Sequence, residues 1–453
     1  MTVDWIDTLL GGNHEFNVPT LTVSSSEIGK LSGNGSVRWN AETGIRIQAV
    51  TDGREAVMTG SSNVSWGQLI DPATYCTFAG LTDNGWNFAS VPEPRGDYTT
   101  SSNLPTVMWD LRVRSIILER QSTRRSGCSL RMLMEPDLPS WVRNTHTTVN
   151  SEAFGEQSAI RCDTLVFDCN IGRVSARRRT NEWFEVQLEI SKSHSEDNIF
   201  KLRMAILMAF SFMCGRLYNI RGHEHISEFT RSRWLHRSIT SSKISNMHKP
   251  IGIYVDYMKN AERLLGLAVN FFLTPIGEKV ADFLCLCWDT VDNSFNTKLA
   301  VTSICLEGLL RVAAEHMGTS HTAQRTSEHE QFEIWLKSNP NGHSERFLKR
   351  LKGCVGDFKR LGANDILHDW VNRKVLGVTK EDIEAWKKIR NASAHGYVDR
   401  SDNRCKLQNQ LYQHDRVENL INKIVLQLMG YTGDFIDYAH CGISSSPFPS
   451  YEL

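Results

Sequence analysis

An arginine and a histidine near the C-terminus have the chemistry needed to cleave a phosphodiester without a metal ion. Arg390 and His395 lie five residues apart in the segment Arg-Asn-Ala-Ser-Ala-His. A guanidinium carries a permanent charge and can stabilise negative charge on phosphate oxygens. An imidazole titrates near neutral pH and can transfer a proton as a general acid or base. Asn391 directly follows the arginine and adds a third polar group to the motif.

The spacing alone does not single out this pair. Two other Arg-x4-His pairs occur in the chain, one at 231/236 and one at 311/316. Only the pair at 390/395 has an asparagine after the arginine. A solvated arginine beside a histidine that caps a helix is the structural alternative, and the motif by itself leaves both open.

The sequence around the motif predicts a helix. Thr379 with Asp382 three residues on is typical of an N-cap, and Gly396 is suited to the position that ends a helix. Apolar residues recur between them at near-helical spacing: Ile383, Trp386 and Ile389. Five residues turn about 140° around a straight helix, so Arg390 and His395 would point apart. Either the helix breaks inside the motif, or a second chain completes the site.

The motif resembles the Arg-x(4–6)-His signature of HEPN domains, which are helical bundles that include many metal-independent ribonucleases. The run from Glu307 to Arg311 resembles the Glu-x3-Lys/Arg element on an earlier HEPN helix. The order of elements is also similar, with helices expected near 277–290 and 294–317, then the motif helix, then a final helix near 408–429. The resemblance covers about residues 276–435, and the preceding half is similar in arrangement to ApeA-like anti-phage proteins.

The resemblance implies a role for each residue of the motif. His395 would be the general acid or base, and Arg390 would stabilise the phosphorane-like transition state. Asn391 would orient the pair or the phosphate, and Glu307 would be a supporting partner. Attack by the ribose 2′-OH needs no metal and no other cofactor. Such sites are commonly composite across a two-fold axis, which implies a homodimer or a larger even-numbered homo-oligomer.

For the whole chain, the resemblance implies a defence protein that acts by abortive infection. The ribonuclease would stay idle until infection and then cleave cellular RNA, with a phage structural protein such as capsid as the suggested trigger. The alternative is a non-catalytic HEPN module that binds nucleotides or partners, in which the β-rich half carries the function. The intact Arg-Asn-x3-His motif favours the enzyme.

Composition limits how the chain could contact RNA. The 453 residues include 51 basic and 51 acidic residues, and 40% of them are hydrophobic, as in ordinary globular proteins. A neutral chain of this kind is not a bulk nucleic-acid coat, so an RNA contact requires a local basic patch. The patch nearest to the motif helix is Arg346, Lys349, Arg350 and Lys352. Solvated helix faces are the alternative explanation for this cluster.

Turn signals and hydrophobic periods divide the chain. Before about residue 196, turns recur between alternating strands, which predicts an all-β sandwich or open barrel. The turn signals include Gly11-Gly12-Asn13, Asn34-Gly35, Asp52-Gly53 and Asp83-Asn84-Gly85. We therefore predict an α+β multidomain protein with a β-rich region, a helical linker, a HEPN-like helical domain and a tail. Their bounds are 1–245 (with a helix near 198–215), 246–275, 276–435 and 436–453.

Neither a metal site nor a membrane segment is expected. The C-x-C pair at 285/287 lacks a partner pair, and His223-Glu224-His225 is better explained by a loop or strand of alternating polar residues. The 11 cysteines are odd in number and follow no disulfide spacing. The apolar run Met204–Cys214 is shorter than the ~20 residues that span a bilayer, and the N-terminus lacks a basic region. We expect a cytoplasmic protein.

Overall fold

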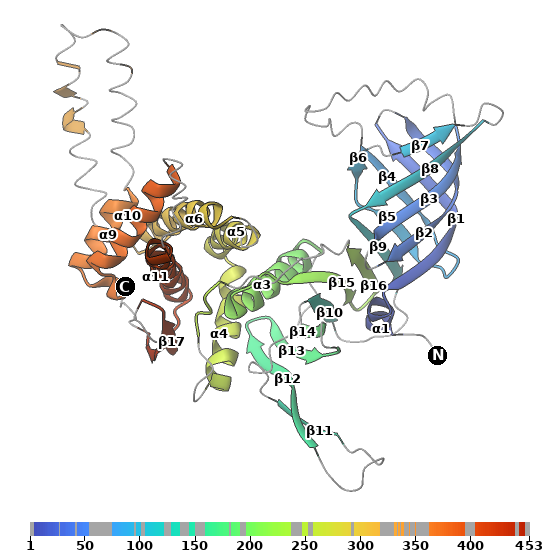
Figure 1. Cartoon of the computed structure of the whole chain (residues 1–453). Coiled ribbons are helices and arrows are strands. Elements are labelled where there is room, and N and C mark those ends of the chain that lie inside the picture. Colours follow the sequence, from blue (N-terminus) through green and yellow to red (C-terminus); the bar gives the residue numbers. More distant parts are fainter. Residues whose placement is uncertain are drawn as a thin grey trace. The chain divides into compact units, whose positions relative to one another are not determined.

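The structure is a computed structural model of the chain (Figure 1). The residues that it describes are 4–26, 28–40, 43–53, 75–94, 97–100, 105–121, 128–135, 145–149, 159–180, 183–190, 196–236, 247–251, 257–290, 294–317, 330–332, 334–335, 337–338, 344, 349, 362–394, 404–439 and 444–448.

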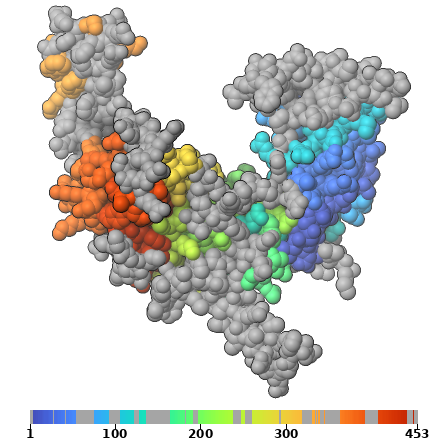
Figure 2. Space-filling view, viewed as in Figure 1, coloured from blue at the N-terminus to red at the C-terminus, as the bar shows by residue number. Residues whose placement is uncertain are grey.

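The chain divides into two compact units, which are described separately. The first comprises residues 1–203 and 218–242, and the second comprises residues 204–217 and 243–453. Figure 2 colours the β-rich unit from blue to green and helices α4 to α11 of the second unit from yellow-green to red. The predicted α+β arrangement, with strands first and helices after them, is confirmed. The helix expected at 198–215 is present as α3 (Glu196–Cys214), but the unit boundary at 203/204 falls inside it.

The elements of the β-rich unit are α1 (Trp5–Leu10), β1 (Asn13–Ser25), β2 (Gly29–Asn40), β3 (Gly44–Asp52), β4 (Tyr75–Leu81), β5 (Asn87–Ser90), β6 (Glu93–Pro94), β7 (Asp97–Thr100), β8 (Thr106–Val113), β9 (Ser115–Gln121), β10 (Cys128–Glu135), β11 (Thr145–Val149), β12 (Ala159–Cys169), β13 (Gly172–Arg178), β14 (Phe184–Ile190), β15 (Asn219–Ile226) and β16 (Thr230–His236). Among the described residues they form one sixteen-stranded antiparallel sheet, in which the order is β11-β12-β13-β14-β10-β15-β16-β9-β5-β4-β1-β2-β3-β8-β7 and β6 pairs with β4.

The sheet curls on itself. Phe78 of β4 and Trp109 of β8 are four strands apart in the sheet order, yet their ring centroids lie 5.9 Å apart. In a flat sheet, four strand spacings would separate them by roughly 19 Å. Both rings belong to one buried core that also contains Trp39 and Phe88. Of the two predicted architectures, this contact favours the open barrel over the sandwich.

Two local features of the β-rich unit differ from the sequence expectation. Asn34-Gly35 is not a turn but lies inside β2, where Gly35 pairs with Val18 of β1 and Ala49 of β3. A Cβ at Gly35 would lie only 2.5 Å from the carbonyl oxygen of Gln48, so the glycine allows a close backbone approach within the sheet. Helix α1 was not predicted, and Asp4 caps it by accepting a hydrogen bond from the Ile6 amide at 3.1 Å.

The second unit is mainly helical. Its elements are α4 (Tyr257–Phe272), α5 (Pro275–Asp289), α6 (Phe295–His316), α9 (Ala363–Asn372), the short 3₁₀ helix η4 (Val375–Gly377), α10 (Lys380–Ala394), α11 (Arg404–Leu428), β17 (Asp434–Asp437) and β18 (Ser444–Pro447). The helices predicted near 277–290, 294–317 and 408–429 are confirmed as α5, α6 and α11. Part of the segment predicted as a tail forms β18, which pairs with β17.

Side-chain caps explain where the central helices begin. The Thr274 hydroxyl accepts a hydrogen bond from the Gly277 amide at 3.0 Å, and Pro275 occupies the first position of α5. The Ser294 hydroxyl caps α6 in the same way. Across the described helices, no single one is both long and apolar enough to cross a membrane; only Asn260–Phe272 with Pro275–Asp289, bent by 106°, meets that test as a pair.

Candidate functional site

The helix that carries the motif, α10, is anchored at its N-terminus by the predicted cap. The Thr379 amide donates to Asp382 Oδ2 at 2.9 Å, and the Asp382 amide donates to Thr379 Oγ1 at 3.3 Å. Arg416 of α11 donates to Asp382 Oδ1 and to Thr379 Oγ1, both at 3.0 Å. This reciprocal cap satisfies helix donors that would otherwise be unpaired, and the arginine fixes α10 against α11.

Arg390 contacts the second residue that the sequence singled out. Its Nε donates to Glu307 Oε1 of α6 at 2.6 Å. The side chain of Arg390 is 52% exposed and that of Glu307 is 23% exposed. The guanidinium carbon also lies 5.7 Å from the centroid of the Trp386 ring, one helical turn earlier. The pair thus presents an oriented guanidinium at the surface, where an anionic ligand could reach it.

Close helix packing sets the position of Glu307. The next residue, Gly308, faces α5, and a Cβ there would lie 2.2 Å from a ring carbon of Phe283. The glycine therefore lets α6 approach α5 closely. The same helix also packs against α10, which brings Glu307 within reach of Arg390.

The other predicted site residues are only partly described. Asn391 lies on α10 beside Arg390 and is exposed. Residues 390–394 are helical, and His395 lies outside the described residues, as do Arg346, Arg350 and Lys352. Lys349 is described and exposed. The structure therefore joins Arg390 to Glu307, while the relation of Arg390 to His395 and the second chain stay predictions.

The two other Arg-x4-His pairs have different surroundings. Arg231 and His236 lie on one strand, β16, where a separation of five residues points side chains to opposite faces. Arg231 donates to Glu224 Oε1 at 2.8 Å, while His236 lies 3.2 Å from His223 on the other face. Arg311 and His316 are both exposed on α6.

The residues considered as metal ligands do not gather around one point. The alternation of β15 directs Glu224 toward Arg231 and Arg233, and it directs His223 and His225 to the opposite face. In the described part of the chain, no group of three or more His, Cys, Asp or Glu residues could hold a metal ion. Cys287 is buried, and burial together with Asp289 and Asp282 raises the pKa of the Cys285 thiol to about 11.

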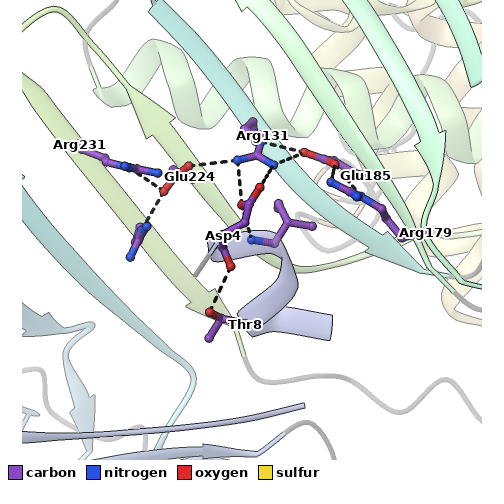
Figure 3. Close-up of polar contacts among 9 residues, drawn as sticks. Asp4, Thr8, Arg131, Arg179, Glu185, Glu224 and Arg231 are labelled. Carbon is purple, nitrogen blue, oxygen red and sulfur yellow. Dashed lines mark hydrogen bonds and ion pairs between the residues drawn. The ribbon is translucent and has the colours of Figure 1, made fainter. Parts of the chain in front are cut away.

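Sequence reasoning missed a network of charged residues in the β-rich unit, centred on the buried carboxylates of Glu185 and Glu224 (Figure 3). Arg131 of β10 pairs with the cap residue Asp4 through two hydrogen bonds of 3.0 Å and with Glu185 of β14 at 2.7 Å. Arg179 also contacts Glu185, and Glu224 accepts from Arg231 at 2.8 Å. These residues come from distant parts of the sequence, so no local motif marks them.

Glu224 is the most buried member of this network. Its side chain has no exposed surface, and Arg233 donates to the same carboxylate oxygen as Arg231, at 2.7 Å. Burial alone would raise the pKa of Glu224, but hydrogen bonds from the two arginines outweigh it and hold the pKa below its ordinary value. The carboxylate is therefore ionised at neutral pH and neutralises the arginines around it.

In comparisons with known proteins, no family model matches the chain, and no curated protein or solved structure is significantly similar to it.

Proposed function

We propose that this protein is a metal-independent endoribonuclease of the HEPN type that acts in anti-phage defence. The observation that carries the proposal is the contact between Arg390 and Glu307. Each was singled out from its own sequence motif, the two are 83 positions apart, and their side chains form a hydrogen bond of 2.6 Å. A half-exposed guanidinium oriented by a carboxylate is suited to bind a phosphate.

In the proposed reaction, the ribose 2′-oxygen attacks phosphorus and the bond from phosphorus to the 5′-oxygen breaks. A base takes the proton of the 2′-OH, an acid supplies one to the leaving 5′-oxygen, and the product is a 2′,3′-cyclic phosphate. His395 performs proton transfer, and Arg390 stabilises charge on the phosphate oxygens. Glu307 positions Arg390, and Asn391 orients the phosphate or the pair.

Assembly completes the proposed site. Arg390 lies on a helix that continues through residue 394. On a straight helix, a group five residues later points about 140° away. A two-fold axis beside α10 would bring a second copy of the motif to the same cleft. A homodimer or larger even-numbered assembly is therefore part of the proposal.

Regulation is assigned to the β-rich unit. A ribonuclease that is active in the cytoplasm would harm its own host, so a two-state element must hold it idle. The β-rich unit would sense infection, with a phage structural protein such as capsid as the trigger. Cleavage of cellular RNA would then stop growth before the phage is released.

The test is RNA cleavage by full-length protein with EDTA present, both purified and in extracts of infected cells. His395→Ala should lower the rate by about 10²–10⁴-fold, as for loss of a general acid or base. Arg390→Lys should also be impaired because a point charge does not replace the planar fork. His316→Ala, from a pair of the same spacing, should leave cleavage unchanged. If His395→Ala matches wild type in cleavage and in phage protection, the protein is not this enzyme and the non-catalytic alternative is favoured.

A further inference from the structure

A cavity of about 190 Å³ lies in the β-rich unit, between the first turns of α3 and the strands β15 and β16. In the register of the two strands, His223 is opposite Trp234 and His225 is opposite Ser232, so all four side chains share one face. Phe200 and Arg203 of α3 contribute to the lining, and Asp197 is exposed at the same site.

Arg203 is a buried cation at this cavity. It is 8% exposed, and its Nε has no hydrogen-bond partner among the described residues. Its contacts with nitrogen acceptors involve one terminal nitrogen, Nη1, which lies 3.3 and 3.4 Å from the two ring nitrogens of His223. A nitrogen almost equally distant from both ring nitrogens is not aligned with either lone pair. His236 Nε2, at 3.3 Å, is the better acceptor.

The neighbours of Arg203 do not balance its charge. Burial, reinforced by the Arg203 charge, lowers the pKa of His236 to about 3 and lowers that of His223 well below its ordinary value. Both rings are therefore neutral at pH 7. Burial lowers the pKa of Arg203 itself only to about 10, so the guanidinium stays charged. Phe200 and Trp234, whose ring centroids lie 4.8 and 5.9 Å from the guanidinium carbon, supply cation–π contact but no negative charge.

We infer that this cavity binds a small oxyanion, a phosphate or carboxylate group, through the buried guanidinium of Arg203. A buried charge is unfavourable unless it is paired, and no described carboxylate pairs with this one. The volume agrees with a ligand of this size, because cavities of about 150 Å³ hold a benzene molecule. Trp234 and Phe200 would contact an apolar part of the ligand. The inference is independent of the proposed ribonuclease.

Binding can be measured with inorganic phosphate as the probe. Full-length protein is added to phosphate at pH 7 and constant ionic strength, and the ³¹P line width is followed. Wild type should broaden the line saturably, and Arg203→Met should abolish this broadening. Lys201→Met removes the same charge from an exposed site on the same helix, and it should bind phosphate like wild type. Acetate should displace phosphate if the site recognises oxyanions in general; retention of phosphate would restrict the ligand to phosphates.

A second variant covers the case in which Arg203→Met fails to fold. Asp197 is exposed, so Asp197→Asn should fold normally, and removal of its negative charge should tighten phosphate binding about threefold. Three results would overturn the inference: no saturable broadening by wild type, equal broadening by folded Arg203→Met, or an equal loss with Lys201→Met.

Discussion

The two faces of the β15–β16 strand pair differ in the partners that their charged side chains have. Glu224 points to one face, where it meets Arg231 and Arg233, and its ion pairs connect through Arg131 to Asp4 and Glu185. The neighbours of Glu224 in the sequence, His223 and His225, point to the other face and line the cavity at Arg203. One face thus has carboxylates among its arginines, whereas the other has Arg203 beside the neutral imidazoles of His223 and His236.

The difference separates a structural role from a binding role. On the first face, each buried carboxylate has an arginine partner, and the network joins the cap of α1 to β10 and β14. Such a network favours one arrangement of the sheet because any other leaves a charge buried and unpaired. On the second face, no described carboxylate pairs with Arg203, and we infer that a bound ligand supplies the negative charge.

Removal of the Glu224 carboxylate, at the centre of the first face, should destabilise the fold of the β-rich unit. Glu224→Gln removes the ion pairs that the fully buried carboxylate makes with Arg231 and Arg233, which are 33% and 16% exposed. We expect a loss of about 3 kcal/mol in the free energy of unfolding, the lower end for a broken buried pair, because water partly solvates the two arginines. This loss can be measured by urea denaturation, monitored by a signal from the β-rich unit. The matched control is Glu15→Gln, because Glu15 pairs with Arg38 at 3.0 Å but is 50% exposed. That change should remove less than about 1 kcal/mol. Equal losses in the two variants would show that the network contributes no more than a surface pair.

Acid should lower the free energy of unfolding because of the histidines on the second face. The pKa of His236 is about 3 in the folded chain, against an ordinary value of 6.5. Below pH 6.5 the unfolded chain therefore binds a proton that the folded chain does not, and stability is lost as the pH falls toward 3. At pH 5 the loss from this residue is about 2 kcal/mol relative to pH 7.

Hydrogen exchange of the β15 and β16 amides at pH 7 and pH 5 would report this loss locally. The groups that face His236 are Arg203, His223 and Ser115, whose Oγ lies 2.9 Å from His236 Nδ1. His236→Gln should reduce the pH dependence because the amide does not titrate in this range, and the part that remains belongs to His223, whose pKa is also lowered. His316→Gln, at an exposed histidine, should leave it unchanged. The same slope in His236→Gln and wild type would contradict the assignment.

Local helix signals could be predicted from the sequence, whereas the contacts on these two faces could not. The cap and the apolar period of residues 379–396 predicted α10, because those signals are local. Helices near α5, α6 and α11 were expected from the order of elements in the HEPN resemblance. The pair Arg131–Asp4 is 127 positions apart, so only the folded sheet brings its members together. The contact of Arg390 with Glu307 was expected only through the resemblance of two motifs. The error at Asn34-Gly35 has the same origin, since a neighbouring strand decides the role of the glycine.

Arg390, which pairs with Glu307, differs from both faces because its charge is half exposed. Because Arg390 is half exposed, water solvates its charge, and loss of the pair should change the free energy of unfolding by less than about 1 kcal/mol. Glu307→Gln should therefore leave the helical unit folded. If the pair orients the guanidinium for catalysis, RNA cleavage should fall about tenfold, as expected when about 1.4 kcal/mol of transition-state stabilisation is lost.

Glu384→Gln is the matched control for this last variant. Glu384 pairs with Lys387 on the same helix at 3.5 Å and is 61% exposed, so its loss should change neither stability nor cleavage. A fall in cleavage confined to Glu307→Gln, with both variants equally stable, would separate positioning from folding. If the two variants cleave RNA equally well, the contact of Glu307 with Arg390 is an ordinary surface ion pair. It would then affect stability only weakly and would not position Arg390 for catalysis.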